Sequence, residues 1–411
     1  MCVLLYFTET TATMFNMREK GILEYDQIVD LSSRSHHDAI LINPGLPALY
    51  QLNTLRKYID KTEKKVRQWT YGRRDRNKQN KVILLVGETG DGKTMMVNTM
   101  INYLLGVKFE DEEFYQITEE GEDVDQSQSQ TSEITVYEVF VEENPTSLTI
   151  IDTPGYGDTE GYEKDREISE YLIRLFSDEE GIHYIDAVCF VMKSSQNRLS
   201  GKEHYIFHSV LSLFGKDIEN NIVFLLTQSD GGPPTDALNA INKAEIPCRR
   251  DEDNQPVHFL FNNRQKEKRN KRYKRVLKSV WEMGDKSMDE FFTLMDEKNR
   301  KSVEMTLDVL KERRRLEACV SNLRETEKSE LLHEAYISIM NLSKITLKAD
   351  SAFTLQHLDF LIPRLKKEGK DEWIQNLEDL RKRGEEQKSK GALRYVMDYT
   401  GQKWNQFLHF K

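Results

Sequence analysis

One segment of the chain combines the residue types that bind phosphate. Residues 87–94 follow the pattern G-x-x-x-x-G-K-[ST], with an apolar run before them and an amphipathic segment after them. Glycines let backbone N–H groups converge on phosphates, the lysine neutralises phosphate charge, and the hydroxyl can bind Mg²⁺. We therefore expect a nucleotide-binding loop made of Gly87, Glu88, Thr89, Gly90, Asp91, Gly92, Lys93 and Thr94.

A second phosphate- and metal-binding element follows downstream. The apolar run Leu148–Ile151 leads into Asp152-Thr153-Pro154-Gly155, an Asp-x-x-Gly pattern. We expect Asp152 to hold Mg²⁺ through a water molecule and the Gly155 N–H to contact the terminal phosphate. Asp-Thr-Pro-Gly is also ordinary turn sequence, so this prediction depends on its place one helix and two strands after the phosphate loop.

A third motif predicts recognition of the nucleotide base. The apolar run Ile222–Leu226 is followed by Thr227-Gln228-Ser229-Asp230, where GTP-binding proteins usually carry [NT]-K-x-D. We expect Thr227 and Asp230 at the base, with the Asp230 carboxylate accepting hydrogen bonds from guanine. Gln228 replaces the lysine that normally packs along the base, a departure that concerns guanine selectivity and not phosphate binding.

The segment that responds to the terminal phosphate should lie between the first helix and the second strand of this domain. The low-complexity run Gln126–Gln130 is followed there by Thr131. We expect Thr131 to bind Mg²⁺ together with Thr94 and Asp152. Thr135 is the alternative, although it also fits a half-buried strand position.

Strand and helix patterns alternate around these motifs. Apolar runs predict strands over residues 81–86, 134–141, 148–151, 187–192, 222–226 and 257–261, and helical spacing predicts helices over residues 97–105 and 168–176. This alternation predicts an α/β fold, a P-loop GTPase domain with a mostly parallel sheet and helices on both faces, followed by an α-helical domain.

The chain divides into three regions that differ in composition and in hydrophobic pattern. Residues 1–78 are mixed, with a basic stretch at Leu55–Trp69 that we expect to be helical and no recognisable chemistry. Residues 79–282 form the expected P-loop domain. Residues 283–411 are rich in charge and show helical spacing, which predicts a helical bundle or hairpin in which Pro363 ends or kinks one helix.

These motifs together resemble one family. The G-E-T-G-x-G-K-T loop, the I-D-T-P-G-Y-G-D run ending at Asp158, and F-N-N-R at Phe261–Arg264 are similar to the immunity-associated nucleotide-binding GTPases, the GIMAP group, which is related to septins and chloroplast import receptors. The resemblance covers about residues 80–282, and the segment Trp281–Leu323 resembles the helical extension of vertebrate relatives. It implies that Asn262 and Asn263 contribute to the guanine site, that the cofactors are GTP or GDP with Mg²⁺, and that a partner G domain faces the nucleotide.

The catalytic residue is not identified by the sequence. Tyr156 follows Gly155, where Ras-like enzymes place a glutamine that orients water. We therefore expect slow hydrolysis by the monomer and residues supplied by a second molecule. The candidate donors, each of which also fits ordinary surface charge, are Glu160, Glu163, Arg166 and Arg264.

Charge and composition bound the remaining classes. The formal net charge of −10 argues against a general nucleic-acid binder, and the four scattered cysteines argue against a disulfide framework or a zinc site. Residues 110–143 are strongly acidic, whereas residues 56–81 and 264–278 are strongly basic. The basic blocks fit contact with RNA or anionic membrane, but a solvated helix face, or pairing with the acidic segment of a second copy of the chain, is the simpler interpretation.

The sequence favours a Mg²⁺-dependent guanine-nucleotide-binding protein with slow GTP hydrolysis stimulated by self-association through the G domain. The competing interpretations are a nucleotide-dependent scaffold without turnover and an adaptor that binds RNA or anionic membrane through the basic blocks. We expect protein partners for the helical domain. No run of about 18 apolar residues and no secretory signal pattern is present, so we expect a cytoplasmic protein without a transmembrane segment.

Overall fold

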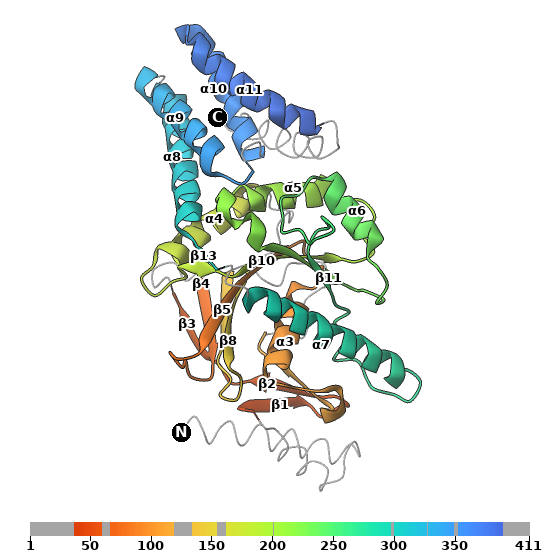
Figure 1. Cartoon of the computed structure of the whole chain (residues 1–411). Helices are drawn as coiled ribbons and strands as arrows, with labels where there is room; N and C mark the ends of the chain where they lie inside the picture. The colour runs from red at the N-terminus through yellow and green to blue at the C-terminus, as the bar shows by residue number, and fades with distance from the viewer. Residues whose placement is uncertain are drawn as a thin grey trace.

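The computed structural model describes residues 37–59, 66–118, 134–153, 162–199, 201–296, 300–326, 328–348 and 352–388 (Figure 1). Within these residues an α/β domain carries a helical extension, as the sequence predicts. Thr131, Gly155 and Glu160 lie outside the described residues, and the side chains of Glu163 and Arg166 are likewise not described.

An eight-stranded sheet forms the centre of the α/β domain. Its strands are β3 (Leu55–Tyr58), β4 (Val66–Tyr71), β5 (Gln79–Gly87), β7 (Ile134–Val139), β8 (Thr146–Asp152), β10 (Ala187–Lys193), β11 (Ile222–Thr227) and β12 (His258–Leu260). The order across the sheet is β12-β11-β10-β5-β8-β7-β4-β3. The strands from β12 to β8 run parallel, and β7 is antiparallel to β8. The six strands predicted from apolar runs are all present.

Strands β3 and β4 show that the helix expected over residues 55–69 is wrong. β3 pairs antiparallel with β4, and β4 pairs parallel with β7. The clustered basic residues suggested a helical face, but Val66, Trp69 and Tyr71 are buried and belong to residue types that favour strands. The edge of β7 offers backbone hydrogen-bond partners to this segment, and the segment therefore forms a strand and not a helix.

Helices cover both faces of the sheet. α4 (Tyr162–Ser177), α5 (Gly201–Leu211) and α6 (Thr235–Lys243) lie on one face, and α3 (Lys93–Leu104) and α7 (Lys274–Asp296) lie on the other (Figure 1). Side chains of β5 alternate between the two cores: Leu84 and Val86 pack with α4 to α6, whereas Ile83 and Leu85 pack with α3 and α7.

A smaller sheet completes the second core. It contains β1 (Ala39–Asn43), β2 (Ala48–Leu52) and β6 (Glu113–Gln116), in the order β1-β2-β6. Tyr50 and Tyr115 are buried between this sheet and α3, and their rings stack at 5.1 Å. Residues that precede the phosphate loop by some forty positions therefore help to hold the helix that follows it.

The helical extension has its own hydrophobic core. It consists of α8 (Glu304–Thr326), α9 (Ser329–Ile345), α10 (Ala352–Glu368) and α11 (Asp371–Lys388). Pro363 lies inside α10 and does not end it, because the helix continues to Glu368. The extension rests on the face covered by α4 and α5, where Arg314 pairs with Glu170 at 2.8 Å.

The expected domain boundaries at residues 79 and 283 can be compared with these elements. Residue 79 is the first residue of β5, so β3 and β4 precede it yet belong to the same sheet, and residue 283 falls inside α7. Immediately before α8, the two-residue strand β13 (Lys301–Ser302) pairs with β9 (Tyr184–Ile185), although no strand was expected there. The division into an N-terminal region, a P-loop domain and a helical domain at these boundaries stays a prediction.

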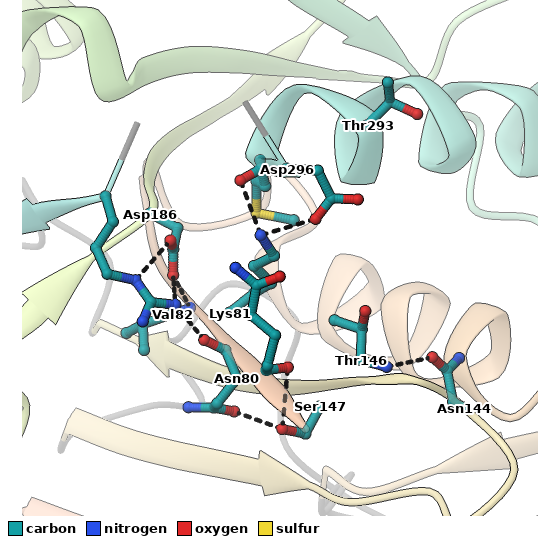
Figure 2. Close-up of polar contacts among 12 residues, drawn as sticks. Asn80, Lys81, Val82, Asn144, Thr146, Ser147, Asp186, Thr293 and Asp296 are labelled. Atoms are coloured by element: carbon teal, nitrogen blue, oxygen red, sulfur yellow. Dashed lines mark hydrogen bonds and ion pairs between the residues drawn. The ribbon is translucent and has the colours of Figure 1, made fainter. Parts of the chain in front are cut away.

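A buried polar cluster fastens α7 and the start of the extension to the first residues of β5 (Figure 2). The Lys81 ammonium, on a side chain only 1% exposed, pairs with Asp296 at 2.8 Å and donates a hydrogen bond to the Met295 carbonyl at 2.9 Å. Beside it, the Asp186 carboxylate accepts hydrogen bonds from the Val82 N–H at 2.7 Å and from Arg300. The strand that ends in the phosphate loop is thus tied at its other end to the extension.

Replacing Lys81 with methionine should destabilise the protein by about 1–3 kcal/mol, because the buried Met295 carbonyl loses its donor. In Lys81→Met the Asp296 carboxylate, on a side chain that is 63% exposed, regains water and adds little to the loss. In Asp296→Asn the buried Lys81 ammonium keeps the Met295 carbonyl and has a neutral amide oxygen in place of the carboxylate, so this variant should lose less stability than Lys81→Met. Urea unfolding of both variants measures this difference. Equal stability of Lys81→Met and the wild type would contradict the proposed anchoring.

Candidate functional site

The carboxyl ends of five parallel strands meet at one edge of the large sheet. β5 leads into Gly87, β8 ends at Asp152, β10 ends at Lys193, β11 ends at Thr227, and Asn262 follows shortly after β12. Ligands of open α/β sheets bind in the crevice at this edge. The phosphate loop, Asp152, the base turn and Asn262, which lie between residues 87 and 262 of the sequence, are therefore brought together.

The phosphate loop has a backbone that requires glycine. Gly90 and Gly92 have φ angles of 89° and 94°, a left-handed conformation that other residues rarely adopt. A Cβ atom at Gly87 would lie 2.4 Å from the Val191 carbonyl oxygen, so the loop also passes too close to β10 for a side chain. At Gly90 a Cβ would meet no atom of the described residues within 4 Å, which leaves the outer side of the loop open.

Lys93 is the first residue of α3 and reaches back over the loop. Its ammonium donates hydrogen bonds to the carbonyl oxygens of Gly87 at 3.0 Å and Glu88 at 3.1 Å. The side chain is largely buried, and it shares the loop with the positive end of the α3 dipole. Thr94, the predicted metal-binding hydroxyl, follows in the first turn and is half-buried. This arrangement favours an anion held between the loop backbone and the ammonium.

Within the phosphate loop and the segment that ends at Asp152, two buried oxygens have no hydrogen-bond partner among the described residues. They are Oδ1 of Asp152 and Oγ1 of Thr89. A buried polar atom left unpaired is costly, so its presence at a site indicates a group that binds there. Carboxylate and hydroxyl oxygens are ligands or water acceptors that suit Mg²⁺. The residues present therefore fit a metal–phosphate group, and the assignment of Asp152 and Thr94 as the metal-binding residues stays a prediction.

Burial raises the pKa of Asp152 to about 6, although the positive charges of Lys93 and Arg67 oppose the shift. A folded-state pKa above the unfolded value means that the protonated carboxyl stabilises the protein below pH ~4 and that this stability is lost as the pH rises through 6. Without nucleotide and Mg²⁺, the ionised carboxylate thus destabilises the fold near neutral pH.

Asp152→Asn should therefore stabilise the nucleotide-free protein at pH 7, by up to about 2–3 kcal/mol, and the gain should shrink towards pH 4. Chemical unfolding without Mg²⁺ at pH 4.5, 6 and 7.5 measures it. Asp253→Asn, in an exposed turn, is the matched control and should show no such trend. A stability gain that does not change with pH would contradict this explanation.

The base-recognition turn lies against the phosphate loop. The Thr227 hydroxyl donates a hydrogen bond to the Asp91 carbonyl at 2.8 Å, so the end of β11 is tied directly to the loop. Asp230 is exposed, and its Oδ1 accepts a hydrogen bond from the Gly232 N–H at 2.9 Å. Gln228 is exposed and adopts a left-handed φ of 54°. Asp230 is thus presented to solvent by a folded turn.

Asn262 and Asn263 connect the last strand to both loops. The Asn262 side-chain amide donates to the Ser229 carbonyl at 2.6 Å, which supports the turn that carries Asp230. Asn263 accepts a hydrogen bond from the Thr99 hydroxyl of α3 at 3.2 Å. Oδ1 of Asn262 and Nδ2 of Asn263 are buried without a partner among the described residues. Both asparagines therefore lie where the sequence predicts a base site.

Thr135, the alternative switch residue, is buried and not half-buried. It faces Asp152 in the antiparallel register of β7 and β8, and its hydroxyl has no hydrogen-bond partner among the described residues. Arg264, one of the candidate donors, is exposed and pairs with Glu267 at 3.5 Å. The roles predicted for Thr131, Gly155 and Glu160 stay predictions, because these residues lie outside the described ones.

The basic block at residues 264–278 is partly used within the molecule. Lys274 pairs with Glu112 at 3.4 Å, Lys278 pairs with Glu110, and Arg269 lies buried against Phe109. These contacts join the start of α7 to η1 (Phe109–Asp111), at the beginning of the acidic block. Part of this block is therefore neutralised within the molecule, whereas the pairing considered from the sequence was with the acidic segment of a second copy of the chain.

One ion pair at the site was not predicted from the sequence. Lys193, the last residue of β10, places its ammonium 3.7 Å from the buried Asp91 carboxylate. Burial raises the pKa of Asp91 to about 6, and the charges of Lys193 and Lys93 oppose the shift. A lysine directly after the apolar run Ala187–Met192 was the signal that could have located it, because polar residues at strand ends face the crevice.

The fold and the site define a P-loop nucleotide-binding protein. A family model described as the AIG1 family matches residues 81–311, more than half of the chain, so the protein belongs to the AIG1 family of P-loop GTPases. The family resemblance drawn from the motifs is thereby confirmed. No curated protein matched the chain.

Solved structures with a similar fold include Toc33 from Arabidopsis thaliana. A dimerization-deficient mutant of Toc33 has 16% identity and a TM-score of 0.34, with 52% of this chain and 85% of Toc33 covered. The complex of Toc33 with Mg²⁺ and GMPPNP has 17% identity and a TM-score of 0.32, with 51% and 86% covered. Among the described residues, no helix is long and apolar enough to cross a membrane.

Proposed function

We propose that this protein binds GTP and GDP with Mg²⁺ and hydrolyses GTP. The observation that carries the proposal is the convergence of the phosphate loop, Lys93, Asp152 and the base turn at one sheet edge, with buried polar atoms left unpaired there. Lys93 and the loop backbone bind the phosphates, Thr94 and Asp152 hold the metal, and Asp230 with the two asparagines contacts the base. Bound Mg²⁺ neutralises charge on the phosphates.

We further propose that hydrolysis is slow in the monomer and faster on self-association through the G domain. Tyr156 follows Gly155, and an aromatic ring cannot orient the attacking water as a glutamine amide does. The protein would then act as a switch or an assembly module, with Thr131 completing the metal site and the helical extension binding protein partners. A cytoplasmic location is part of the same proposal.

Phosphate release at increasing protein concentration tests hydrolysis and its dependence on self-association. The proposal predicts that specific activity, measured with GTP at saturating concentration, rises with protein concentration. A specific activity independent of concentration would contradict stimulation by self-association. Absence of phosphate release at every concentration, with GTP bound, would instead support a nucleotide-dependent scaffold.

A further inference from the structure

An acidic side chain is buried inside the phosphate loop. The Asp91 side chain is 8% exposed, and its Oδ2 accepts a hydrogen bond from the Glu88 N–H at 3.2 Å. A carboxylate at this position lowers the positive potential of the loop, whereas the proposed ligand is a polyphosphate. It also engages a backbone N–H of the loop. Lys93 offsets part of this charge, but the phosphate ligand competes for it, so the loop needs a second cation near Asp91.

Lys193 meets that need from the neighbouring strand. Its ammonium lies 3.7 Å from Oδ1 of Asp91, while its side chain stays 39% exposed on the open side of the sheet edge. Lys193 is also in register with Thr227, and the adjacent Ser194 N–H donates to the Thr227 carbonyl at 2.8 Å. Lys193 thus lies between the phosphate loop and the base turn and contacts the former directly.

The base turn itself offers no cation at this junction. Gln228, immediately after Thr227, is neutral and exposed with a left-handed backbone. Asp91 is held from two sides, by the Thr227 hydroxyl at its carbonyl oxygen and by Lys193 at its carboxylate. The positive charge that joins the two loops comes from the end of β10, one strand over from the base-recognition turn.

We infer that Lys193 is a positioning residue for nucleotide binding, which locks the phosphate loop to the base turn through Asp91 in place of a lysine at position 228. The inference rests on the proposed function and names a residue beyond the three motifs. Lys193 acts through Asp91, so its effect depends on the Asp91 charge. A lysine introduced at position 228 supplies the same charge from the adjacent turn.

A double-mutant cycle tests this dependence. Calorimetric titration with GTP and with GDP in Mg²⁺ gives the affinities of the wild type, K193Q, D91N and D91N/K193Q. We expect K193Q to weaken binding by about tenfold, as for loss of one partner of a partly buried charge pair. In the D91N background the same change should cost less than about twofold. An equal loss in both backgrounds, or no loss with K193Q, would overturn the inference.

Rescue separates positioning from a general packing role. K193Q/Q228K should regain affinity to within about threefold of the wild type, because the added lysine restores a cation at the junction. K243Q, at an exposed position in the last turn of α6, carries the same charge change and should bind as the wild type does. If Q228K does not improve the affinity of K193Q, the inference that Lys193 acts in place of a lysine at position 228 is wrong.

The results that would refute the role of Lys193 differ from those that would refute the proposed function. A wild-type protein that binds neither GTP nor GDP would refute the proposed function, whereas wild-type binding with an unaffected K193Q would refute only the inference. If K193Q does not fold, two other measurements test the inference. One compares the affinities of D91N and D91N/K193Q, and the other measures binding by K193Q/Q228K. Binding by K193Q/Q228K supports the inference, and its absence contradicts it.

Discussion

Replacement of Lys93 by alanine is expected to reduce the affinity for GTP and GDP by at least about 100-fold. The Lys93 ammonium lies at the phosphate loop, where it donates hydrogen bonds to the carbonyl oxygens of Gly87 and Glu88. Charge-assisted hydrogen bonds to phosphate contribute about 1.5–3 kcal/mol each, so loss of two such bonds gives this factor. Calorimetric titration of the variant with both nucleotides measures it.

A matched control is available in the same helix. Asp289, far from the loop on α7, accepts a hydrogen bond from Tyr103 of α3 at 2.6 Å, so Tyr103→Phe perturbs α3 without touching the loop. Tyr103→Phe should bind nucleotide as the wild type does. Wild-type affinity in Lys93→Ala would show that residues 87–94 are not the phosphate-binding loop.

Replacement of Asp230 by alanine should remove the preference for GTP over ATP. The Asp230 carboxylate is exposed on a turn held by Gly232 and supported by Asn262 through Ser229, which presents it to a base. Two hydrogen bonds from guanine to a carboxylate contribute about 1.5–3 kcal/mol each, so discrimination should fall by about 100-fold or more. Affinities of the variant for GTP and ATP, measured side by side, give the ratio.

Asp236→Ala provides the comparison for this experiment. Asp236 is an exposed acidic residue at the start of α6, a few positions beyond the turn, and its removal causes the same change in net charge. It should leave the GTP-to-ATP ratio intact. An unchanged ratio in Asp230→Ala would place base recognition elsewhere, with Asn262 and Asn263 as the next residues to test.

The parallel part of the sheet could be predicted because its strands are buried on both faces. Ile222–Leu226 and Ala187–Met192 are continuous apolar runs, and such runs followed by Gly, Asp or Thr signal the ligand-binding ends of strands. The phosphate loop, Asp152 and the base turn were located in this way. The positions of these motifs after successive strands were enough to place them at one site, because the carboxyl ends of parallel strands lie at the same edge of a sheet.

The edge of the sheet and the links between motifs could not be predicted in the same way. Strand β4 depends on the partner offered by β7, which lies some seventy residues away in the chain. The pairing of Lys193 with Asp91 depends on the order in which β10 lies beside β5. Pro363 suggested an end to α10, but packing of the extension against its own core outweighs the lost hydrogen bond.

Titration of the wild-type protein with GTP, GDP and ATP, each with and without Mg²⁺, tests the central claim most directly. We predict saturable binding of one GTP or GDP per chain, tighter GTP binding with Mg²⁺ than without it, and much weaker binding of ATP. Failure of GTP and GDP to bind to folded protein in the presence of Mg²⁺ would contradict the assignment of this sheet edge as a guanine-nucleotide site.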